Sequence, residues 1–398
     1  MIHISFDTQA FIDVHQQSDV RTLALQAKKY PQVDMPFALN QIAGRQKAQT
    51  KLPSWAAISD IIYPVHLSME QCSSEQTACY KASLVKGRTL VDLTGGFGVD
   101  CSFLSRNFDH ADYVEHQVEL AEIAEHNFEV LGLKDKIAVH AGDGVDFLQG
   151  MDRVDVIYLD PARRDNHGGK VVSIGDCEPD VSRLEEMLLQ KADIVLVKLS
   201  PMLDIKLACQ TLRHVKEVHV VAVNNECKEL LLLLSKKKGT EQDDIPYICV
   251  NFSRSGDIQC FGFTEREEQT ATTVYADPQT YLYEPNAAVM KAQGFNVLTQ
   301  RFPVEKLQVN SHVYTSSELV ADFPGRRFRI LGVSGLGKKE LKSFLEGISQ
   351  ANLTVRNFPS SVADLRKRLK LKEGGDDYIF ATTLQDGRKV LIKAVAIR

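Results

Sequence analysis

The stretch LVDLTGGFGVD, at residues 90–100, has the pattern of a buried strand that runs into a glycine turn. Further along the chain, VDVIYLDPARRD (154–165) has the pattern of a second strand, which ends in Asp160 and Pro161. A glycine turn lets the backbone approach a ligand closely, and it starts a helix whose N-terminus faces that ligand. The two stretches therefore predict a small-molecule site at the ends of two strands.

The surrounding pattern indicates an α/β fold. Strands are expected at TLVDL, ADYVE, IAVHA, VDVIYLD, ADIVLVKLS and EVHVVAV, with an amphipathic helix at 119–133 that stops at Gly132. Because strands and helices alternate over 88–225, the sequence predicts a parallel sheet that is covered on both faces. YICVNF (247–252) and IQCFGF (258–263) flank a Ser-Gly turn and predict an antiparallel hairpin that closes the sheet.

Changes of pattern along the chain predict four domains. Helical spacing of apolar residues at 19–30 and 37–51 indicates a small helical domain at the N-terminal end. After the acidic stretch EREEQTATT, strands and helices of a compact α+β module follow, with Asp386-Gly387 as a hairpin turn. The predicted domains are a helical domain at 1–85, a parallel-sheet domain at 86–263, a small α+β (ferredoxin-like) linking segment at 264–325 and a basic α+β domain at 326–398.

The composition argues against several classes of protein. None of the eight cysteines forms a C-x-x-C pair, so neither a zinc site nor a disulfide framework is expected. No apolar run reaches the ~18 residues of a membrane span, and LLLLL (230–234) is interpreted as a buried helix segment. The N-terminal stretch lacks a basic region, so no signal peptide is expected. The composition predicts a cytoplasmic protein with no membrane or metal partner, and it gives no prediction of the oligomeric state.

Charge is distributed unevenly along the chain. The formal net charge is −5, but residues 326–398 hold 16 Lys and Arg against 7 Asp and Glu. If ADLRKRLKLK (363–372) is a helix, Leu365 and Leu369 face the core and the cations face outward, where they suit a phosphate backbone. A solvated basic surface without a partner is the alternative. The cations expected to bind RNA are Arg366, Lys367 and Arg368.

Two classes of ligand use a glycine turn of this kind, dinucleotides and S-adenosylmethionine. Gly96 and Gly98 match the first two glycines of the dinucleotide pattern G-x-G-x-x-G, but Cys101 replaces the third, which disfavours a dinucleotide. Glu115 ends the second strand, where a carboxylate can accept both ribose hydroxyls, and Asp143 follows the third strand near an adenine edge. Both acids have an alternative role as helix caps or turn residues, although their joint occurrence favours a ligand role.

Several stretches carry a resemblance to a known family. These are HLSMEQCSSEQTACYKA (66–82), VDLTGGFGVD, LDPARRD, YLYEPNAA (281–288) and TVRNFPSSVADLRKRLKLKEGGDDYIFAT (354–382). Over nearly its whole length the chain resembles bacterial class I S-adenosylmethionine-dependent methyltransferases with a C-terminal THUMP-like domain. The resemblance implies a Rossmann-like methyltransferase domain, and a segment at Gln71–Thr77 that covers the methionine end of the cofactor. The implied cofactor contacts are Ser74, Thr77, Asp92, Thr94, Gly96, Gly98, Glu115, Asp143 and Gly144.

The resemblance also places Asp160 and Pro161 beside the methyl group and the target atom. Asp160 and the carbonyl next to Pro161 suit an amine target, because they can accept its hydrogens and leave its lone pair facing the methyl group. Arg163 or Arg164 could stack on a base or bind phosphate, or could form a salt-bridged surface turn instead. Lys198 is expected to contact substrate, with an ion pair to Asp160 or Asp204 as the alternative.

Carbon methylation of a pyrimidine would require a cysteine nucleophile. The fifth strand ends in VKLSP, which offers Ser200 instead, and Cys177 is the only remaining thiol of interest, with a structural role favoured for it. Together with the resemblance and the basic C-terminal domain, this favours methylation of a nitrogen on structured RNA, either rRNA or tRNA, as the expected activity. The alternatives are a methyltransferase for a protein or small molecule, and a binding protein that has lost catalysis.

Overall fold

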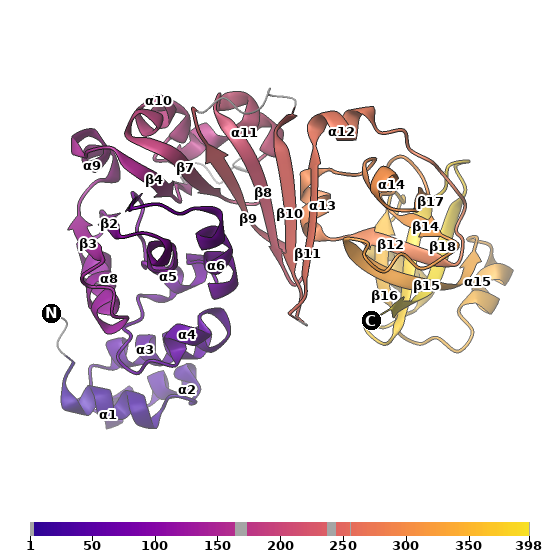
Figure 1. Cartoon of the computed structure of the whole chain (residues 1–398). Coiled ribbons are helices and arrows are strands. Elements are labelled where there is room, and N and C mark those ends of the chain that lie inside the picture. The colour runs from indigo at the N-terminus through magenta and orange to yellow at the C-terminus, as the bar shows by residue number, and fades with distance from the viewer. Residues whose placement is uncertain (1–3, 164–172, 237–243, 255, 398) are drawn as a thin grey trace. The chain divides into compact units, whose positions relative to one another are not determined.

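The computed structural model describes residues 4–163, 173–236, 244–254 and 256–397 (Figure 1). The chain forms two compact units. The first holds Met1–Lys216 and Leu231–Gly239, and the second holds Glu217–Leu230 and Thr240–Arg398.

Five parallel strands form the centre of the first unit. They are β1 (Thr89–Asp92), β2 (His110–Glu115), β3 (Ile137–Ala141), β4 (Val154–Leu159) and β7 (Ala192–Leu199). Their order is β7-β4-β1-β2-β3, and each neighbouring pair is parallel, which confirms the predicted parallel sheet. The chain leaves β1 toward β2 and β3 and then returns to β4 on the other side of β1. Ligands of open parallel sheets bind where the order switches in this way, at the carboxyl ends of the strands.

Helices follow these strands. They are α7 (Val99–Leu104), α8 (Val118–Val130), α9 (Gly144–Gly150), α10 (Val181–Lys191) and α11 (Ile205–Thr211), with the short elements η2 (Ser105–Asn107), β5 (Ala162–Arg163), η3 (Ile174–Asp176) and β6 (Cys177–Glu178). The apolar side of α8 packs on β2 and β3, where the rings of Phe128 and Tyr113 have centroids 5.3 Å apart. The chain leaves α8 through Gly132 at φ +71°, which confirms the predicted stop.

The N-terminal residues of the first unit are helical, as predicted. The elements are α1 (Phe6–Val14), α2 (Val20–Leu25), η1 (Ala27–Lys29), α3 (Met35–Lys51), α4 (Pro53–Ala56), α5 (His66–Gln71) and α6 (Glu75–Leu84). Asn127 of α8 is fully buried and exchanges two hydrogen bonds with the backbone of Ile62, at 2.9 and 2.8 Å. The ring of Phe97, in the glycine loop, packs against Trp55 with centroids 5.1 Å apart. The helices therefore pack directly on the part of the sheet that carries the glycine loop.

The expected helix at residues 230–234 is wrong. These leucines lie in β9 (Glu226–Leu234), and all five are buried. The hairpin that joins β8 (Val215–Val223) to β9 turns at Asn224 and Asn225, which have φ of 54° and 62°. Two consecutive residues with positive φ are typical of the tight turns that join antiparallel strands, and asparagine adopts this conformation readily. Leucine favours helices in isolation, but burial within a sheet outweighs that preference.

The second unit contains the predicted hairpin. β10 (Pro246–Phe252) lies parallel to β8 and antiparallel to β11 (Ile258–Thr264). The acidic stretch that follows is the helix α12 (Glu265–Thr270), which starts with a capping box between Thr264 and Glu267. The two side chains bond each other's backbone N–H groups, so a short polar helix is stable here.

A seven-stranded sheet forms the C-terminal part of the second unit, in orange to yellow in Figure 1. Its order is β13 (Glu305–Lys306), β14 (Tyr314–Ser316), β12 (Tyr281–Pro285), β15 (Gly325–Ser334), β18 (Lys389–Ile397), β17 (Asp377–Thr383) and β16 (Asn352–Arg356), and its helices are α13 (Ala287–Ala292), α14 (Leu298–Arg301), α15 (Lys338–Phe344) and α16 (Val362–Leu369). One cluster of buried apolar residues joins α15 and α16 to this sheet, through Phe344, Leu365 and Ile379 among others. A second cluster contains Phe328, Phe380 and Ile392. The α/β fold class with C-terminal α+β modules is confirmed.

His312 makes the stability of this second unit depend on pH. Its ring stacks on Phe295 with centroids 3.7 Å apart, and burial, aided by the positive charges of Lys306 and Arg356, lowers its pKa from 6.5 to about 4. Between these values the unfolded chain binds a proton that the folded chain does not, so we expect stability to fall as the pH drops from 6.5 to about 4. In His312→Asn, which tolerates the positive φ of 51°, the unfolding midpoint should vary less with pH over this window. Identical pH profiles for the two proteins would contradict the assignment.

Candidate functional site

The glycine loop at the end of β1 is fixed by backbone contacts. Gly96 and Gly98 have φ of +57° and +83°, a region that favours glycine, and a Cβ on Gly95 would lie 2.2 Å from the Tyr113 ring. The Gly95 N–H donates to the carbonyl of Val114 at 2.8 Å, and the Tyr113 hydroxyl donates to the carbonyl of Gly96 at 2.5 Å. The loop therefore holds its conformation against β2 and leads directly into α7.

Asp92, at the end of β1, has an unused acceptor. The side chain is fully buried, and its Oδ1 accepts the Thr94 N–H at 3.0 Å. Its Oδ2 is buried and has no hydrogen-bond partner among the described residues. Burial raises the pKa of Asp92 well above its usual range. A buried polar atom without a partner costs free energy, so this oxygen suits a donor from a bound ligand.

Glu115 joins the loop of β1 to the end of β2. Its Oε2 accepts the Gly96 N–H at 2.8 Å, and its Oε1 accepts the Gln117 N–H at 2.9 Å. The side chain is buried, and His116 Nδ1 also lies 3.0 Å from Oε1, so the oxygen with a spare lone pair is Oε2. The carboxylate is therefore held in one orientation beside the glycine loop while it can still accept hydrogen bonds from hydroxyl groups.

Asp143 acts as a helix cap, which was the alternative to its predicted ligand role. Its Oδ1 accepts the N–H groups of Val145 and Asp146 at 2.7 and 3.0 Å, at the start of α9. The neighbouring Gly144 packs so tightly that a Cβ would lie 2.2 Å from the Leu93 carbonyl oxygen. The loop after β3 thus touches the loop after β1, and only glycine fits between them.

Asp160 is tied to β1 and to Lys198. Its N–H donates to Thr94 Oγ1 at 2.6 Å, and its Oδ2 forms an ion pair with Lys198 Nζ. The ion pair is the alternative considered for Lys198, and it joins the ends of β4 and β7. Pro161 is buried next to this pair. The ends of β1, β2, β3 and β4 therefore meet at one edge of the sheet, which is the arrangement predicted for these four strands, and Lys198 of β7 joins them.

The residues after Pro161 are only partly described. β5 pairs with β6, and Cys177 of β6 is 1% exposed, which agrees with a structural role for this thiol. The structure describes the backbone of Arg163, whereas Arg164 lies outside the described residues. The predicted contacts of both arginines with substrate remain predictions.

A buried charge network beside the glycine loop was not predicted. Lys81 of α6 is fully buried, and its Nζ lies 3.2 Å from Oδ1 of Asp100 and donates to Ser73 Oγ at 3.0 Å. Asp100 Oδ2 accepts the hydroxyls of Ser73 and Tyr158 at 2.8 and 2.7 Å. Burial would raise the pKa of Asp100, but the cations of Lys81 and Lys198 and these hydroxyl donors hold it below its usual value. The network joins α6 and α7 to β4.

Ser74 and Thr77 lie beside this network, at the start of α6. The Ser74 hydroxyl caps the helix by accepting the Thr77 N–H at 3.3 Å, and Thr77 Oγ1 donates to the Ser74 carbonyl at 3.1 Å. Since the Ser73 hydroxyl donates a hydrogen bond to Asp100, the predicted covering segment Gln71–Thr77 is anchored to the first turn of α7, which follows the glycine loop. The one sign of this network in the sequence is that Lys81 and Asp100 are charged residues within apolar surroundings.

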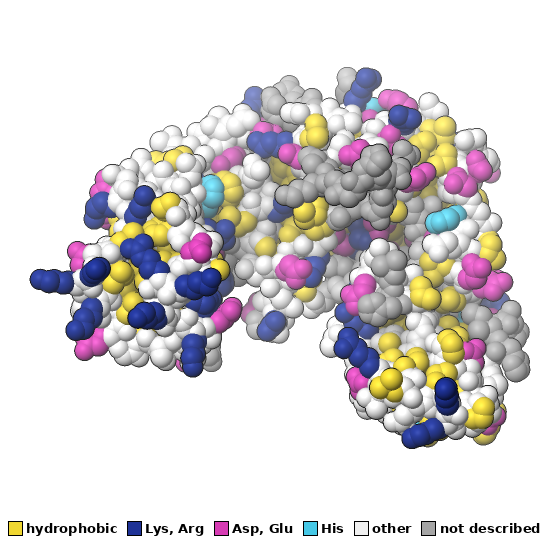
Figure 2. Space-filling view, turned by 180° about the vertical axis from the view of Figure 1, so that it is seen from behind, with side chains coloured by type: hydrophobic (Ala, Val, Ile, Leu, Met, Phe, Trp, Pro, Cys, Tyr) yellow, Lys and Arg dark blue, Asp and Glu magenta, His cyan; other side chains and the backbone are white. Residues whose placement is uncertain are grey.

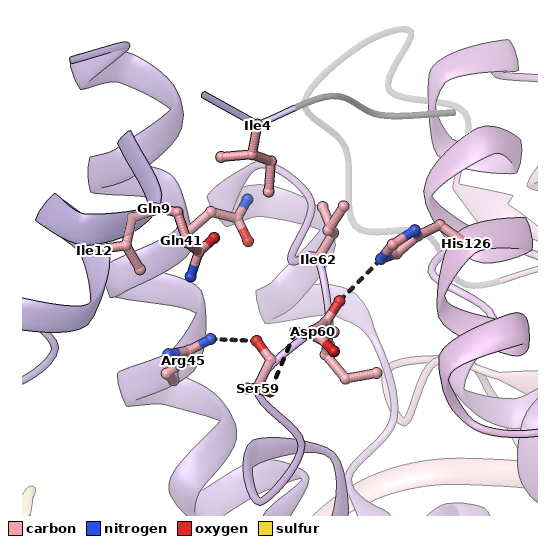
Figure 3. A pocket seen from close by; sticks show the side chains of 10 residues that line it. Ile4, Gln9, Ile12, Gln41, Arg45, Ser59, Asp60, Ile62 and His126 are labelled. Atoms are coloured by element: carbon pink, nitrogen blue, oxygen red, sulfur yellow. Dashed lines mark hydrogen bonds between the residues drawn. The ribbon is translucent and has the colours of Figure 1, made fainter. Parts of the chain in front are cut away.

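Figure 3 shows a pocket elsewhere in the first unit. Arg45 donates to the Ser59 carbonyl at 2.6 Å, and the His126 ring bonds the Asp60 carbonyl at 2.9 Å (Figure 3). Arg45 of α3 and His126 of α8 thus both bond the backbone of the segment at residues 59–60. These contacts suit a structural role, in which they hold the two helices together. The pocket contains none of the predicted site residues. It is lined by Ile4, Gln9, Ile12, Gln41, Arg45, Ser59, Asp60, Ile61, Ile62 and His126.

The predicted RNA-binding cations lie on α16 of the second unit. Leu365 and Leu369 are buried and the cations face solvent, which confirms the predicted amphipathic helix. Arg366 is partly engaged, since it lies 3.8 Å from Glu373, whereas Lys367 and Arg368 have no ion-pair partner among the described residues. Figure 2 shows Lys and Arg side chains gathered on the C-terminal part of the chain, at the left of the view. We call the exposed cations the α16 basic surface: Lys367, Arg368, Lys370 and Lys372.

Neither a cluster of metal ligands nor a membrane span is found in the described part of the chain. There, no group of three or more His, Cys, Asp and Glu side chains is placed to hold a metal ion. No helix in the same residues is both long and apolar enough to cross a membrane.

The C-terminal part matches two domain families. Residues 281–324 match a ferredoxin-like domain, and residues 325–394 match a THUMP domain-like family. No curated protein matches the chain. The four-domain division of the chain remains a prediction.

Among solved structures, a "putative methyltransferase" from Porphyromonas gingivalis W83 is similar over 100% of both chains, with 33% identity and a TM-score of 0.88. TrmK of M. capricolum with S-adenosylhomocysteine has 13% identity over 42% of this chain and 70% of its own, and a TM-score of 0.33. An O-methyltransferase from Bacillus cereus, also with this compound, has 14% identity over 46% and 97%, and a TM-score of 0.33. The assignment rests on the first structure alone, because the other two are too distant. The chain belongs to the family of the Porphyromonas gingivalis protein, a methyltransferase family with a ferredoxin-like and a THUMP-like domain.

Proposed function

We propose that the chain is an S-adenosylmethionine-dependent methyltransferase that methylates a nitrogen atom of structured RNA. The observation that carries this proposal is the convergence of the loops after β1, β2, β3 and β4 at the switch in strand order. The loops bring together the unpartnered Oδ2 of Asp92, the oriented carboxylate of Glu115 and the Asp160-Pro161 pair. This edge of the sheet offers acceptors for an adenosine, a glycine loop whose one large side chain, Phe97, packs against Trp55, and a carboxylate for a target amine.

The residues present fit the cofactor. Glu115 would accept the ribose hydroxyls, Asp143 would use its second oxygen near the adenine, and Asp92 would gain the partner that its Oδ2 lacks. Gly96 leaves the backbone open to close approach, since a Cβ there would meet only the Thr94 carbonyl oxygen, at 3.7 Å. Gly98 and Gly144 instead let the loops pack tightly on neighbouring protein atoms, and Thr94 holds the glycine loop to β4. Ser74 and Thr77 would place the covering segment over the methionine end. When bound, S-adenosylmethionine supplies an activated methyl group.

Asp160 would orient the target nitrogen. Its Oδ2 is held by Lys198, while its Oδ1 accepts no hydrogen bond from the described residues. An amine that donates to Oδ1 and to the carbonyl beside Pro161 directs its lone pair away from both acceptors, toward the methyl group. Lys198 therefore serves to hold the Asp160 carboxylate in one orientation, and any contact of Lys198 with substrate is secondary. Such alignment is the main task left to the protein, because the methyl group is already activated.

The RNA part of the proposal rests on the second unit. Its THUMP-like domain carries the α16 basic surface, whose cations face solvent without ion-pair partners in the described part of the chain. A charged, amphipathic helix of this kind can follow a phosphate backbone. Arg366, Lys367 and Arg368 would supply the first contacts.

The direct test is incubation of the full chain with isotope-labelled S-adenosylmethionine and unmodified total RNA, followed by nucleoside mass analysis. We expect the label in an N-methylated nucleoside. A label on a ring carbon would contradict nitrogen as the target. A label found only on protein or on a small molecule would contradict RNA as the substrate. If RNA, protein and small molecules all stay unlabelled, the non-catalytic alternative is favoured.

Reversal of charge on the α16 basic surface should weaken RNA binding. For Lys367→Glu with Arg368→Glu, we expect affinity for an unmodified tRNA transcript to fall at least tenfold at low salt. The slope of log affinity against log salt should fall by about two, because each phosphate contact contributes about one. The matched control is Lys28→Glu with Lys29→Glu, two exposed lysines of the first unit. Equal losses in both variants would show that only the total charge matters.

A further inference from the structure

Two arginines of the THUMP-like domain share one buried glutamate. Glu284, in the YLYEPNAA stretch, is 2% exposed, and its Oε2 accepts Nε and Nη2 of Arg326, the former at 2.9 Å. Its Oε1 accepts Nε and Nη2 of Arg356 at 3.1 and 2.8 Å. Glu284 lies on β12, Arg326 on β15 and Arg356 on β16, so the sheet curls enough to bring the edge strand β16 back toward β12. We call these three residues the Glu284 triad.

The triad holds both guanidinium groups in fixed orientations. Each arginine turns the same edge, Nε and Nη2, toward the glutamate, so each Nη1 is left without a hydrogen-bond partner among the described residues. The Arg326 guanidinium also lies over the rings of Phe328 and Tyr378, 5.5 and 5.9 Å from their centroids. Packing and hydrogen bonds therefore restrict the arginine side chains before any ligand binds, which lowers the entropy that binding costs.

The triad keeps a surplus of positive charge that is open to solvent. One carboxylate balances one of the two arginines, and the side chains of Arg326 and Arg356 remain 41% and 35% exposed. Among the described residues, Glu284 is the one acid that forms an ion pair with Arg326 or Arg356. The positive charges of Lys306 and Arg356 both act on His312 and help burial to lower its pKa. A purely structural pair would need only one arginine for this glutamate.

From this geometry we propose that Arg326 and Arg356, oriented by Glu284, form a fork that binds a backbone phosphate of the RNA substrate. Phosphate oxygens match the planar donors of guanidinium groups, and two guanidinium groups that share one anchor can grip one phosphate from two sides. The proposal rests on RNA as the partner in the proposed function. It adds a site at the junction of the ferredoxin-like and THUMP-like domains, separate from the α16 basic surface.

The test compares charge-preserving variants in binding to a fluorescein-labelled, unmodified tRNA transcript without cofactor. We expect Arg326→Lys and Arg356→Lys each to bind about tenfold more weakly than the natural chain, although the net charge is unchanged, because lysine lacks the fork. Arg329→Lys is the matched control, since Arg329 is an exposed arginine of the same strand β15, and it should bind within twofold. Inorganic phosphate should compete with the transcript for the natural chain more strongly than for either fork variant.

Glu284→Gln separates the fork from simple attraction by charge. The substitution raises the positive charge, so unspecific attraction predicts tighter RNA binding, whereas loss of the oriented fork predicts weaker binding. Thermal unfolding of each variant identifies any that are misfolded, and Arg326→Lys keeps the test available if Glu284→Gln does not fold. Binding by the lysine variants within twofold of the natural chain would overturn the proposal. Because binding is measured without methyl transfer, failure of the RNA methylation assay would not affect this result.

Discussion

Replacement of Asp160 by alanine is expected to lower the rate of methyl transfer by about a thousandfold, with affinity for the cofactor changed by no more than a few-fold. Asp160 holds no part of the glycine loop through its side chain, since its contact with Thr94 uses the backbone N–H. The side chain instead meets Lys198 and faces the position proposed for the target amine. Loss of a group that aligns the nucleophile typically costs two to three orders of magnitude in rate (about 3–4 kcal/mol).

Two measurements are needed for this variant. Single-turnover methyl transfer reports the chemical step, and equilibrium binding of S-adenosylhomocysteine reports the cofactor site. Asp160→Asn keeps one carbonyl acceptor and should retain more activity than Asp160→Ala, whereas Asp109→Ala, an exposed acid at the opposite end of β2, should leave both values unchanged. Loss of S-adenosylhomocysteine binding in Asp160→Ala would contradict the proposed role of Asp160.

Replacement of Lys81 by methionine is expected to destabilise the first unit by about 3–5 kcal/mol, the usual cost of removing one partner from a buried ion pair. The substitution leaves Asp100 buried and without its closest cation, while Ser73 loses the donor at 3.0 Å. Trp55 is the one tryptophan in the chain and is buried in this unit, so its fluorescence in urea reports the unfolding of the first unit.

A double-mutant cycle makes this prediction specific. Lys81→Met with Asp100→Asn removes both charges and should recover at least half of the lost stability, because no uncompensated charge remains. Lys86→Met, an exposed lysine just after α6, is the control and should change stability by less than about 0.5 kcal/mol. Additive losses in the double variant would show that Lys81 and Asp100 do not act as a pair.

The local patterns predict the parallel sheet well because each strand and each loop carries its own signal. Alternating strands and helices, the glycine turn and the acids at strand ends were enough to place Asp92, Glu115, Asp143 and Asp160 at one edge. The run at 230–234 was misread because five leucines carry no periodicity, and the turn signal lay in Asn224 and Asn225. Two consecutive asparagines are typical of the tight turn in a hairpin, so they were the local sign that a strand follows.

The pairing of the buried charged groups could not be predicted from local sequence patterns. Lys81 and Asp100 are neighbours only because α6 folds back onto α7, and a lysine in a helix is normally expected to face water. Glu284 and Arg356 are likewise brought together by the curl of a sheet in which three strands separate β12 from β16. Such pairs depend on the tertiary structure, so spacing in the sequence carries no sign of them.

The most direct test of the central claim is isothermal titration of the purified chain with S-adenosylhomocysteine. If the loops after the parallel strands form the cofactor site, the natural chain binds one molecule per chain, and Glu115→Ala binds at least tenfold more weakly while its fold is retained. No binding by the natural chain, or equal binding by the Glu115 variant, would contradict the account.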